Sequence, residues 1–460
     1  MGTTKAISDK NNLTVGSPIK KIILFTIPVL LGALFQQFYG LVDAIIVDRT
    51  LGQTAFSSVG ITGSLSFLVL GFAQGTTAGF SVVASQYFGA KEMDKVRKSI
   101  ATSFLLCVIL TVILTALMAV FTRPLLQLLN TPEKYFENSY AYISTIFYGM
   151  GATILYNIAA YILRALGDSK TPLYFLVVAC VLNIGMDLLF IIVFKMGIAG
   201  AGWATVLSQL LAGIACLVYM FIKYPVIRLK KEDWKTSFRF CMKHLNIGIP
   251  MGFQFSIIAI GIMIQQAAIN SLGDDVVTAY TAASRIDNLF VQGYGALGTT
   301  MATFCGQNLG AKQYDRMKRG VRDATILGVC ITVVIATVIS IFGESMTYWF
   351  ISTATKEQAQ LCQKYLIYQA MFYLLLMAIY VYRNSLQGMN YSSITVVAGI
   401  LELVMRCLAA FVLVQLWGFV GICLSNPVAW VGADIILLPA YFFAIRKFKK
   451  KQLVEVTATK

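Results

Sequence analysis

Long apolar runs recur along the whole sequence, and their length decides what this chain can fold into. Most hold the roughly 20 residues that a helix needs to cross a bilayer, and the mean hydropathy of the chain is +0.74. The runs therefore predict an all-α polytopic membrane protein with twelve transmembrane helices. Their lack of a period-two alternation argues against an outer-membrane barrel. They lie near residues 20–47, 57–86, 99–121, 139–163, 172–194, 198–222, 245–271, 277–305, 322–342, 361–382, 393–415 and 419–445.

The charged residues are few and unevenly placed. They make up 13% of the chain, and the net charge is +16. Twenty-nine of the 37 Lys and Arg residues fall in segments on one side of the predicted spans, against six on the other. Positive loops mark the cytoplasmic side, so we expect a multi-pass protein of the inner (plasma) membrane with both termini cytoplasmic. The basic charge then orients the chain in the bilayer and does not indicate nucleic-acid binding. Asp48, beside Arg49 at the outer end of the first run, is predicted to be solvated.

The sequence lacks the motifs of an enzyme or of a cofactor site. Its nine cysteines occur singly, without a CxxC pair, and most lie in apolar runs where Cys acts as a small hydrophobe. Neither a metal-ligand cluster, a nucleophile elbow nor a phosphate loop can be recognised. We therefore expect no enzymatic activity and no cofactor, and we assign no metal site.

Two segments near the ends of the second and eighth runs are alike. SQYFGAKEMDKVRK at 85–98 aligns with GQNLGAKQYDRMKR at 306–319, 221 residues later. Pro28 and Pro250 hold corresponding places early in the first run of each half. This internal repeat predicts two pseudo-symmetric six-helix bundles. Parallel repeats of this kind suit a transporter that opens alternately to the two sides of a membrane.

The repeat also suggests the domain boundaries. We predict an N-lobe over residues 1–222 and a C-lobe over residues 245–460. The basic segment 223–244, KYPVIRLKKEDWKTSFRFCMKH, is predicted to be a cytoplasmic linker between them.

Ionisable residues inside the first-half spans are the candidates for function. Asp43 follows Tyr39 by four residues, and Asp187 follows Asn183 by four, so each pair shares a helix face. Thr205 lies in the next span. A membrane-buried carboxyl group is costly as a bare charge, so it takes a proton or another partner. The oxygens of Asp43, Asn183, Asp187 and Thr205 would also suit Na⁺. Polar contacts that merely hold helices together are the plainer alternative, although Ser or Thr would serve that purpose at lower cost.

The second half carries charges whose role the sequence leaves open. Glu402 and Arg406 are four residues apart and predict an intrahelical ion pair. Arg285 and Asp287 are two apart and cannot share a helix face. Asp434 lies alone in the last run.

Taken together, these features resemble the MATE (multidrug and toxic compound extrusion) family, and in particular its DinF-like branch. The resemblance rests on twelve spans in two repeats, an early proline in the first span and a GAK loop after the second. LRALGDSKTP at 163–172 resembles the family's exit from the fourth span. By this resemblance Pro28 would be the hinge of the first span. The cation-coupling residues that it implies are Tyr39, Asp43, Asn183, Asp187 and Thr205.

The resemblance implies secondary active multidrug efflux. Inward H⁺ or Na⁺ flow would drive the export of small-molecule drugs or toxic organic cations, in the manner of proteins that confer antibiotic resistance. The protein would work in the lipid bilayer as a monomer. A flippase for lipid-linked precursors, from the same superfamily, is the alternative. Such flippases often have more spans or several cationic residues in the cavity, and here only Arg285 and Arg406 fall within the predicted spans.

Overall fold

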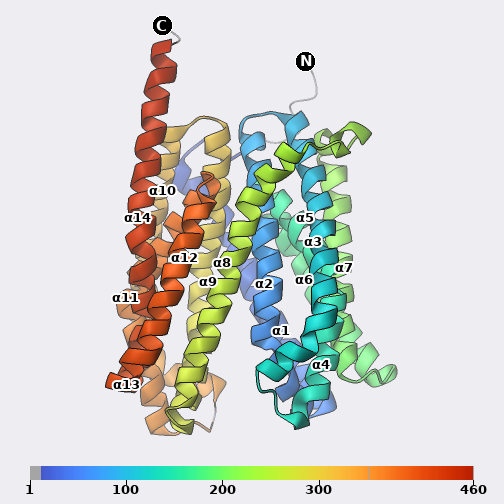
Figure 1. Cartoon of the computed structure of the whole chain (residues 1–460), viewed down its shortest axis with the longest axis vertical. Coiled ribbons are helices and arrows are strands. Elements are labelled where there is room, and N and C mark those ends of the chain that lie inside the picture. Colours follow the sequence, from blue (N-terminus) through green and yellow to red (C-terminus); the bar gives the residue numbers. More distant parts are fainter. Residues whose placement is uncertain (1–11, 352, 459–460) are drawn as a thin grey trace. The chain divides into compact units, whose positions relative to one another are not determined.

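The computed structural model describes residues 12–351 and 353–458, and the regular structure in these ranges is entirely helical (Figure 1). Within these ranges, ten helices are long and apolar enough to cross a membrane, or up to eleven if the bent pair α4 and α5 forms one span. The 37-residue helix α9 is less apolar and, added to these eleven spans, is the twelfth long helical segment of the described chain. The elements are α1 (Pro18–Leu51), α2 (Gln53–Gly89), α3 (Met93–Leu128), α4 (Glu133–Tyr148), α5 (Met150–Ala165), α6 (Lys170–Leu188), η2 (Leu189–Val193), α7 (Ile198–Lys223), η3 (Pro225–Ile227), η4 (Lys231–Trp234), α8 (Phe238–Asn270), α9 (Asp274–Gly310), α10 (Tyr314–Phe350), α11 (Lys356–Gly388), α12 (Ser392–Leu408), η5 (Ala409–Leu413), α13 (Val414–Trp417) and α14 (Phe419–Ala458).

The predicted all-α membrane fold is confirmed, and the helices generally extend beyond the apolar runs. The sixth run, 198–222, matches α7 almost residue for residue, whereas the third run, 99–121, is the middle of the longer α3. The fourth run was predicted as one span, but it bends by 48° between α4 and α5. Gly149 at this bend lies against Val206, where a Cβ atom would overlap the valine side chain. Close approach of α7 therefore accounts for a glycine at the break.

The chain forms two compact units. Unit 1 contains Leu31–Ser256, and unit 2 contains Leu13–Leu30 together with the described part of Ile257–Lys460. The chain thus passes from one unit to the other inside α1, shortly after Pro28, and inside α8, shortly after Pro250.

The segment before α1 is held firmly in unit 2. Arg316 on α10 donates hydrogen bonds to the carbonyl oxygens of Leu13 (2.9 Å) and Val15 (3.2 Å), and the side chain of Gln307 accepts one from the Leu13 amide. Further along α1, the hydroxyl of Thr26 donates to that of Thr300 on α9 at 2.9 Å. These contacts explain why the first part of α1 belongs to unit 2.

The internal repeat is visible in the backbone as well as in the sequence. Gly52 and Gly273, which precede α2 and α9, both have positive φ, as do Gly197 and Gly418. So do the two GAK lysines that follow these helices, Lys91 (φ 61°) and Lys312 (φ 56°). The members of each pair are 221 residues apart, so the same turn geometry recurs at the same places in both halves.

Within unit 1, α8 packs on α2 through facing glycines. Gly75 and Gly79 on α2 lie against Met251 and Gly248 on α8, and a Cβ atom at Gly79 would come within 2.5 Å of the Gly248 Cα atom. Small residues at this spacing let two helix backbones approach closely, which is how membrane helices gain packing contacts.

This contact makes a stability prediction. In Gly75→Ala the new Cβ would overlap the carbonyl oxygen of Met251, so we expect a loss of about 1–3 kcal/mol in stability, as for other overpacked sites. Gly63→Ala on the same helix is the matched control because its Cβ would meet nothing within 4 Å. Thermal unfolding of the purified proteins in detergent measures both. Equal unfolding midpoints in the two variants would contradict the packing interpretation.

The linker 223–244 lies against unit 1 and contains two short 3₁₀ helices, η3 and η4. Arg97 on α3 donates to the carboxylate of Asp233 and to the carbonyl oxygen of Val226, both at 3.3 Å. His244 is buried, and its ring bonds to the Ser99 hydroxyl at 2.8 Å. The linker is therefore attached to α3 by specific polar contacts.

The turn between α5 and α6 is organised by Asp168. Its carboxylate accepts hydrogen bonds from the amide and hydroxyl of Thr171 (3.1 and 2.8 Å), from Lys223 Nζ (3.3 Å) and from the Tyr224 hydroxyl (2.9 Å). Burial opposes ionisation of this carboxyl, but the Thr171 bonds, the lysine charge and the tyrosine bond outweigh it, so its pKa lies below the usual value. The turn thus depends on a buried carboxylate.

The lowered pKa sets the pH dependence of this turn. Because the folded-state pKa of Asp168 is lower than the unfolded value of about 3.9, its stabilisation is complete well above that value. It is lost as the pH falls through the folded-state pKa. We expect Asp168→Asn to lower stability by about 1–3 kcal/mol at neutral pH, with the difference from wild type shrinking in acid. Unfolding midpoints of both proteins as a function of pH measure this; a difference that does not change with pH would contradict it.

Candidate functional site

The five residues predicted to couple a cation come together in unit 1. Tyr39 and Asp43 lie on α1, Asn183 and Asp187 on α6, and Thr205 on α7. Asp187 and Asn183 are fully buried, and Asp43 is 6% exposed. Asp48, five residues beyond Asp43 on the same helix, is exposed.

A hydrogen-bond network links these three helices. The Tyr39 hydroxyl donates to Thr205 Oγ1 at 3.1 Å. In the amide orientation that matches donors to acceptors, Asn183 Nδ2 donates to Asp187 Oδ2 at 3.0 Å. Asn183 Oδ1 then lies 3.2 Å from the Tyr39 hydroxyl and 3.3 Å from the Thr205 amide. Each four-residue pair expected from the sequence is therefore part of one connected set.

The two carboxyl groups meet at the centre of this set. Asp43 and Asp187 are close enough for their side chains to share a hydrogen bond. One oxygen of each, Asp43 Oδ1 and Asp187 Oδ1, has no hydrogen-bond partner among the described residues. Two ionised carboxylates at this separation repel one another, so a proton or another cation between them would relieve the repulsion.

Comparison with known proteins identifies the kind of molecule that carries this site. The MatE family model matches residues 28–189 and again residues 250–412, so each match begins at one of the paired prolines. The chain belongs to the MATE family. It is 32% identical over 366 residues to the probable multidrug resistance protein YpnP of Bacillus subtilis, covering 79% of this chain and 80% of that protein.

Other relatives of this MATE protein carry different names. It is 24% identical to a protein of Shewanella oneidensis named FAD transporter, over 68% of this chain and 70% of the relative. In fold it is similar to a structure described as the outward-facing conformation of a multidrug resistance MATE family transporter of the MOP superfamily. That similarity has a TM-score of 0.89 at 22% identity and covers 98% of this chain and all of the other. The protein is thus a multi-span membrane transporter, while its placement in the DinF-like branch stays a prediction.

A pocket adjoins the carboxyl pair in this MATE protein. It lies among α1, α5, α6 and α7, and the Tyr39 side chain lines it while bonding to Thr205. Other polar groups in its wall come from Gln36, Ser208 and Gln209, and the side-chain oxygen of Gln209 has no partner among the described residues. These residues were not predicted from the sequence. Gln36 could have been found, because it shares a helix face with Tyr39 and Asp43.

Tyr142 on α4 is a further neighbour that the sequence analysis missed. It lies within electrostatic range of Asp43, Tyr39 and Asp187. Aromatic residues are too common in spans for sequence spacing to single it out, and the bend between α4 and α5 gives α4 a direction of its own.

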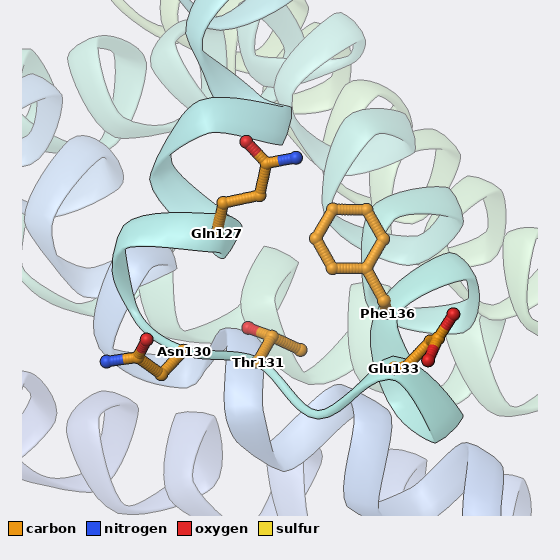
Figure 2. A pocket seen from close by; sticks show the side chains of 5 residues that line it. All are labelled: Gln127, Asn130, Thr131, Glu133 and Phe136. Atoms are coloured by element: carbon orange, nitrogen blue, oxygen red, sulfur yellow. The ribbon is translucent and has the colours of Figure 1, made fainter.

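A second pocket lies at the turn between α3 and α4 and is lined by residues distant in sequence from the carboxyl pair. Figure 2 shows it with Gln127 and Phe136 on either side and Asn130 directed away; Thr131 and Glu133 complete its wall. It contains none of the predicted coupling residues, so it is not part of the candidate site.

Contacts within unit 2 account for most of the charged residues of the second half whose role the sequence left open. The predicted ion pair between Glu402 and Arg406 is present at 3.1 Å. Arg383 joins it at 2.6 Å, so Glu402 holds two arginines. Arg383 follows the end of the tenth predicted span, 361–382, but it still lies inside α11 and is 4% exposed. Asp287 accepts a hydrogen bond from Tyr373.

Proposed function

We propose that this MATE protein is a secondary active multidrug antiporter, which exports organic, often cationic, compounds in exchange for inward H⁺ or Na⁺. The observation that carries the proposal is the buried pair of carboxyl groups on α1 and α6, each with one oxygen that has no hydrogen-bond partner in the described ranges. Membrane-buried ionisable residues of this kind mark ion pathways and proton relays. Their cost in stability is otherwise unexplained.

Tyr39 connects ion binding to the compound. Its ring lines the pocket, and its hydroxyl belongs to the network around Asp43 and Asp187. A cation bound between the two carboxyl groups changes the net charge beside Tyr39 and Asn183. A compound in the pocket contacts the same tyrosine, so the two ligands affect each other's binding through shared side chains.

Pro28 supports a moving first helix. It interrupts the hydrogen-bond ladder of α1 two residues before the chain passes from unit 2 to unit 1. We propose that α1 changes its bend near Pro28 as the carboxyl pair gains or loses its cation, and that this closes or opens the pocket.

The driving force is adequate for export. One elementary charge that moves inward through 100 mV supplies about 2.3 kcal/mol. Because a tenfold ratio corresponds to about 1.4 kcal/mol, that supports a roughly fiftyfold gradient of a neutral compound. A pH or Na⁺ gradient adds to it.

Experiment must decide whether the coupling ion is H⁺ or Na⁺. A proton needs only the two carboxyl groups, and the hydrogen-bonded orientation of Asn183 fits it. Sodium needs several oxygen ligands, which a rotation of the Asn183 amide would help to supply together with Thr205 Oγ1.

Proteoliposomes containing the full-length protein test the function and the ion together. A fluorescent organic cation such as ethidium is used with an imposed pH gradient, an imposed Na⁺ gradient, or neither. We expect transport against the ethidium gradient in one ion arm and none without a gradient. Equal ethidium movement in all three arms would refute secondary active antiport of this class of compound.

A further inference from the structure

Unit 2 contains a buried ionic cluster that the proposed transport cycle does not use. Glu402 on α12 receives Arg383 from α11 on one carboxylate oxygen and Arg406 from its own helix on the other. All three side chains are buried. The triad carries one net positive charge, which a neighbouring carboxyl group can offset only while that group is ionised.

Asp434 on α14 is that group, but it is not bonded to the triad. It is 4% exposed, and both of its carboxylate oxygens lack a hydrogen-bond partner among the described residues. It lies within electrostatic range of Arg383 and Glu402. Arg383 in turn has an Nε–H for which the described part of the chain offers no acceptor. An unused donor and two unused acceptors therefore lie in one buried cluster.

Glycines allow close packing of the helices that carry these groups. Gly432, two residues before Asp434, packs against Met405 of α12, where a Cβ atom would come within 2.7 Å of the methionine Cγ. Gly261 on α8 leaves room for Arg406, whose Cδ atom would lie 3.1 Å from a Cβ there. Gly432 thus lets α14 approach α12 closely, while Asp434, two residues later, lies on a different face of α14. The neighbouring helices that hold the cluster, α11, α12 and α14, are seen in Figure 1.

We propose that Asp434 is a proton-binding site of unit 2, separate from the Asp43–Asp187 pair, and that the arrangement described here is its protonated state. A carboxylate that is buried in a membrane span without a single donor is strongly disfavoured. Protonation removes that cost. It also explains why Arg383 remains with Glu402 while its Nε–H has no acceptor.

The proton balance is simple. In the protonated state an O–H bond on Asp434 holds a proton taken from water, and the cluster of Arg383, Arg406, Glu402 and Asp434 has a charge of +1. Release of the proton makes the cluster neutral. The Arg383 Nε–H then supplies the donor that the new carboxylate lacks, and the contacts among α11, α12 and α14 change with it.

Other titratable groups around the cluster modify this equilibrium. Tyr380 on α11 lies within electrostatic range of Arg383, Glu402, Arg406 and Asp287. A metal cation is a poor alternative ligand, because it needs several oxygen donors. Both Glu402 oxygens already bind guanidinium groups, whose positive charge would repel the metal ion. A proton needs only the Asp434 oxygen.

Infrared spectroscopy of the purified full-length protein tests the proposal without measuring transport, so it stands or falls independently of the proposed function. The carbonyl stretch of a protonated carboxyl group, which shifts in D₂O, is recorded as a function of pH. We expect one such band to be lost as the pH rises, to be absent in Asp434→Asn, and to remain in the Asp43→Asn/Asp187→Asn double variant. Asp287→Asn, which removes another acidic group of unit 2, is the matched control and should keep the band.

Each other outcome decides against the proposal. A spectrum of Asp434→Asn identical to wild type at every pH would mean that Asp434 is permanently ionised. A band of Asp434 that persists at all pH values would mean that it does not exchange its proton. If Asp434→Asn does not fold, Asp434→Glu provides the same information, because the band should move and not disappear.

Discussion

Ion-driven ethidium export is expected to collapse when either Asp43 or Asp187 is replaced by Asn. Each substitution removes one ionisable carboxyl from the buried pair, so the repulsion that makes the pair take up a cation disappears. Without the coupled ion, the imposed ion gradient can no longer drive ethidium against its own concentration gradient. Ethidium accumulation in proteoliposomes with the imposed ion gradient measures the effect.

Asp48→Asn is the matched control for this prediction. It makes the same chemical change on the same helix, five residues from Asp43, but at an exposed position. Its export should equal that of wild type. Near-wild-type export in both Asp43→Asn and Asp187→Asn would show that the carboxyl pair does not couple the ion.

Glu402→Gln is expected to be the most damaging single change in unit 2. It leaves Arg383 and Arg406, both buried, without the carboxylate that binds them. Breaking a buried ion pair from one side typically costs about 3–5 kcal/mol, because a buried charge is left unpaired. We expect a large loss of folded protein, measured as the monodisperse fraction after extraction in detergent.

Two further variants separate this charge effect from a general sensitivity to substitution. Glu357→Gln, an exposed position in the first turn of α11, should leave the folded yield unchanged. Replacing the whole triad by apolar residues, with Arg383→Met, Glu402→Leu and Arg406→Leu, should restore much of the yield, because complete removal of buried charges is often neutral. A triple variant as unstable as Glu402→Gln would contradict the explanation.

Local patterns predicted much of this protein, and the reason is visible in particular residues. The apolar runs placed the membrane helices because burying a backbone in lipid leaves a helix as the satisfied conformation. The pairs Tyr39–Asp43 and Glu402–Arg406 could be read from four-residue spacing, since that spacing places both side chains on one helix face. Asp48 could be separated from Asp43 by its place at the end of the run.

Contacts between helices lay beyond such patterns. Arg383 falls just beyond the predicted run 361–382, and the sequence gives no sign of its partner, Glu402, because that residue lies on another helix. Asp43 and Asp187 stood out as ionisable residues of the first-half spans, but no spacing rule places residues 144 positions apart next to one another. Tyr142, Ser208 and Gln209 were missed for the same reason.

The sequence by itself determined the class of molecule, its duplicated plan and the residues that a membrane could not bury without a purpose. Hydrophobic length, charge placement and the 221-residue repeat are properties of the chain that hold before any helix meets another. Only the tertiary structure decided which buried charges have partners. It pairs Arg383 with Glu402 and places the Asp43 and Asp187 carboxyl groups next to one another. It also leaves the Asp434 carboxyl group without a hydrogen-bond partner among the described residues. Those pairings depend on how closely the helices approach one another. Glycines such as Gly432 permit a close approach, but sequence spacing does not show which helices will meet.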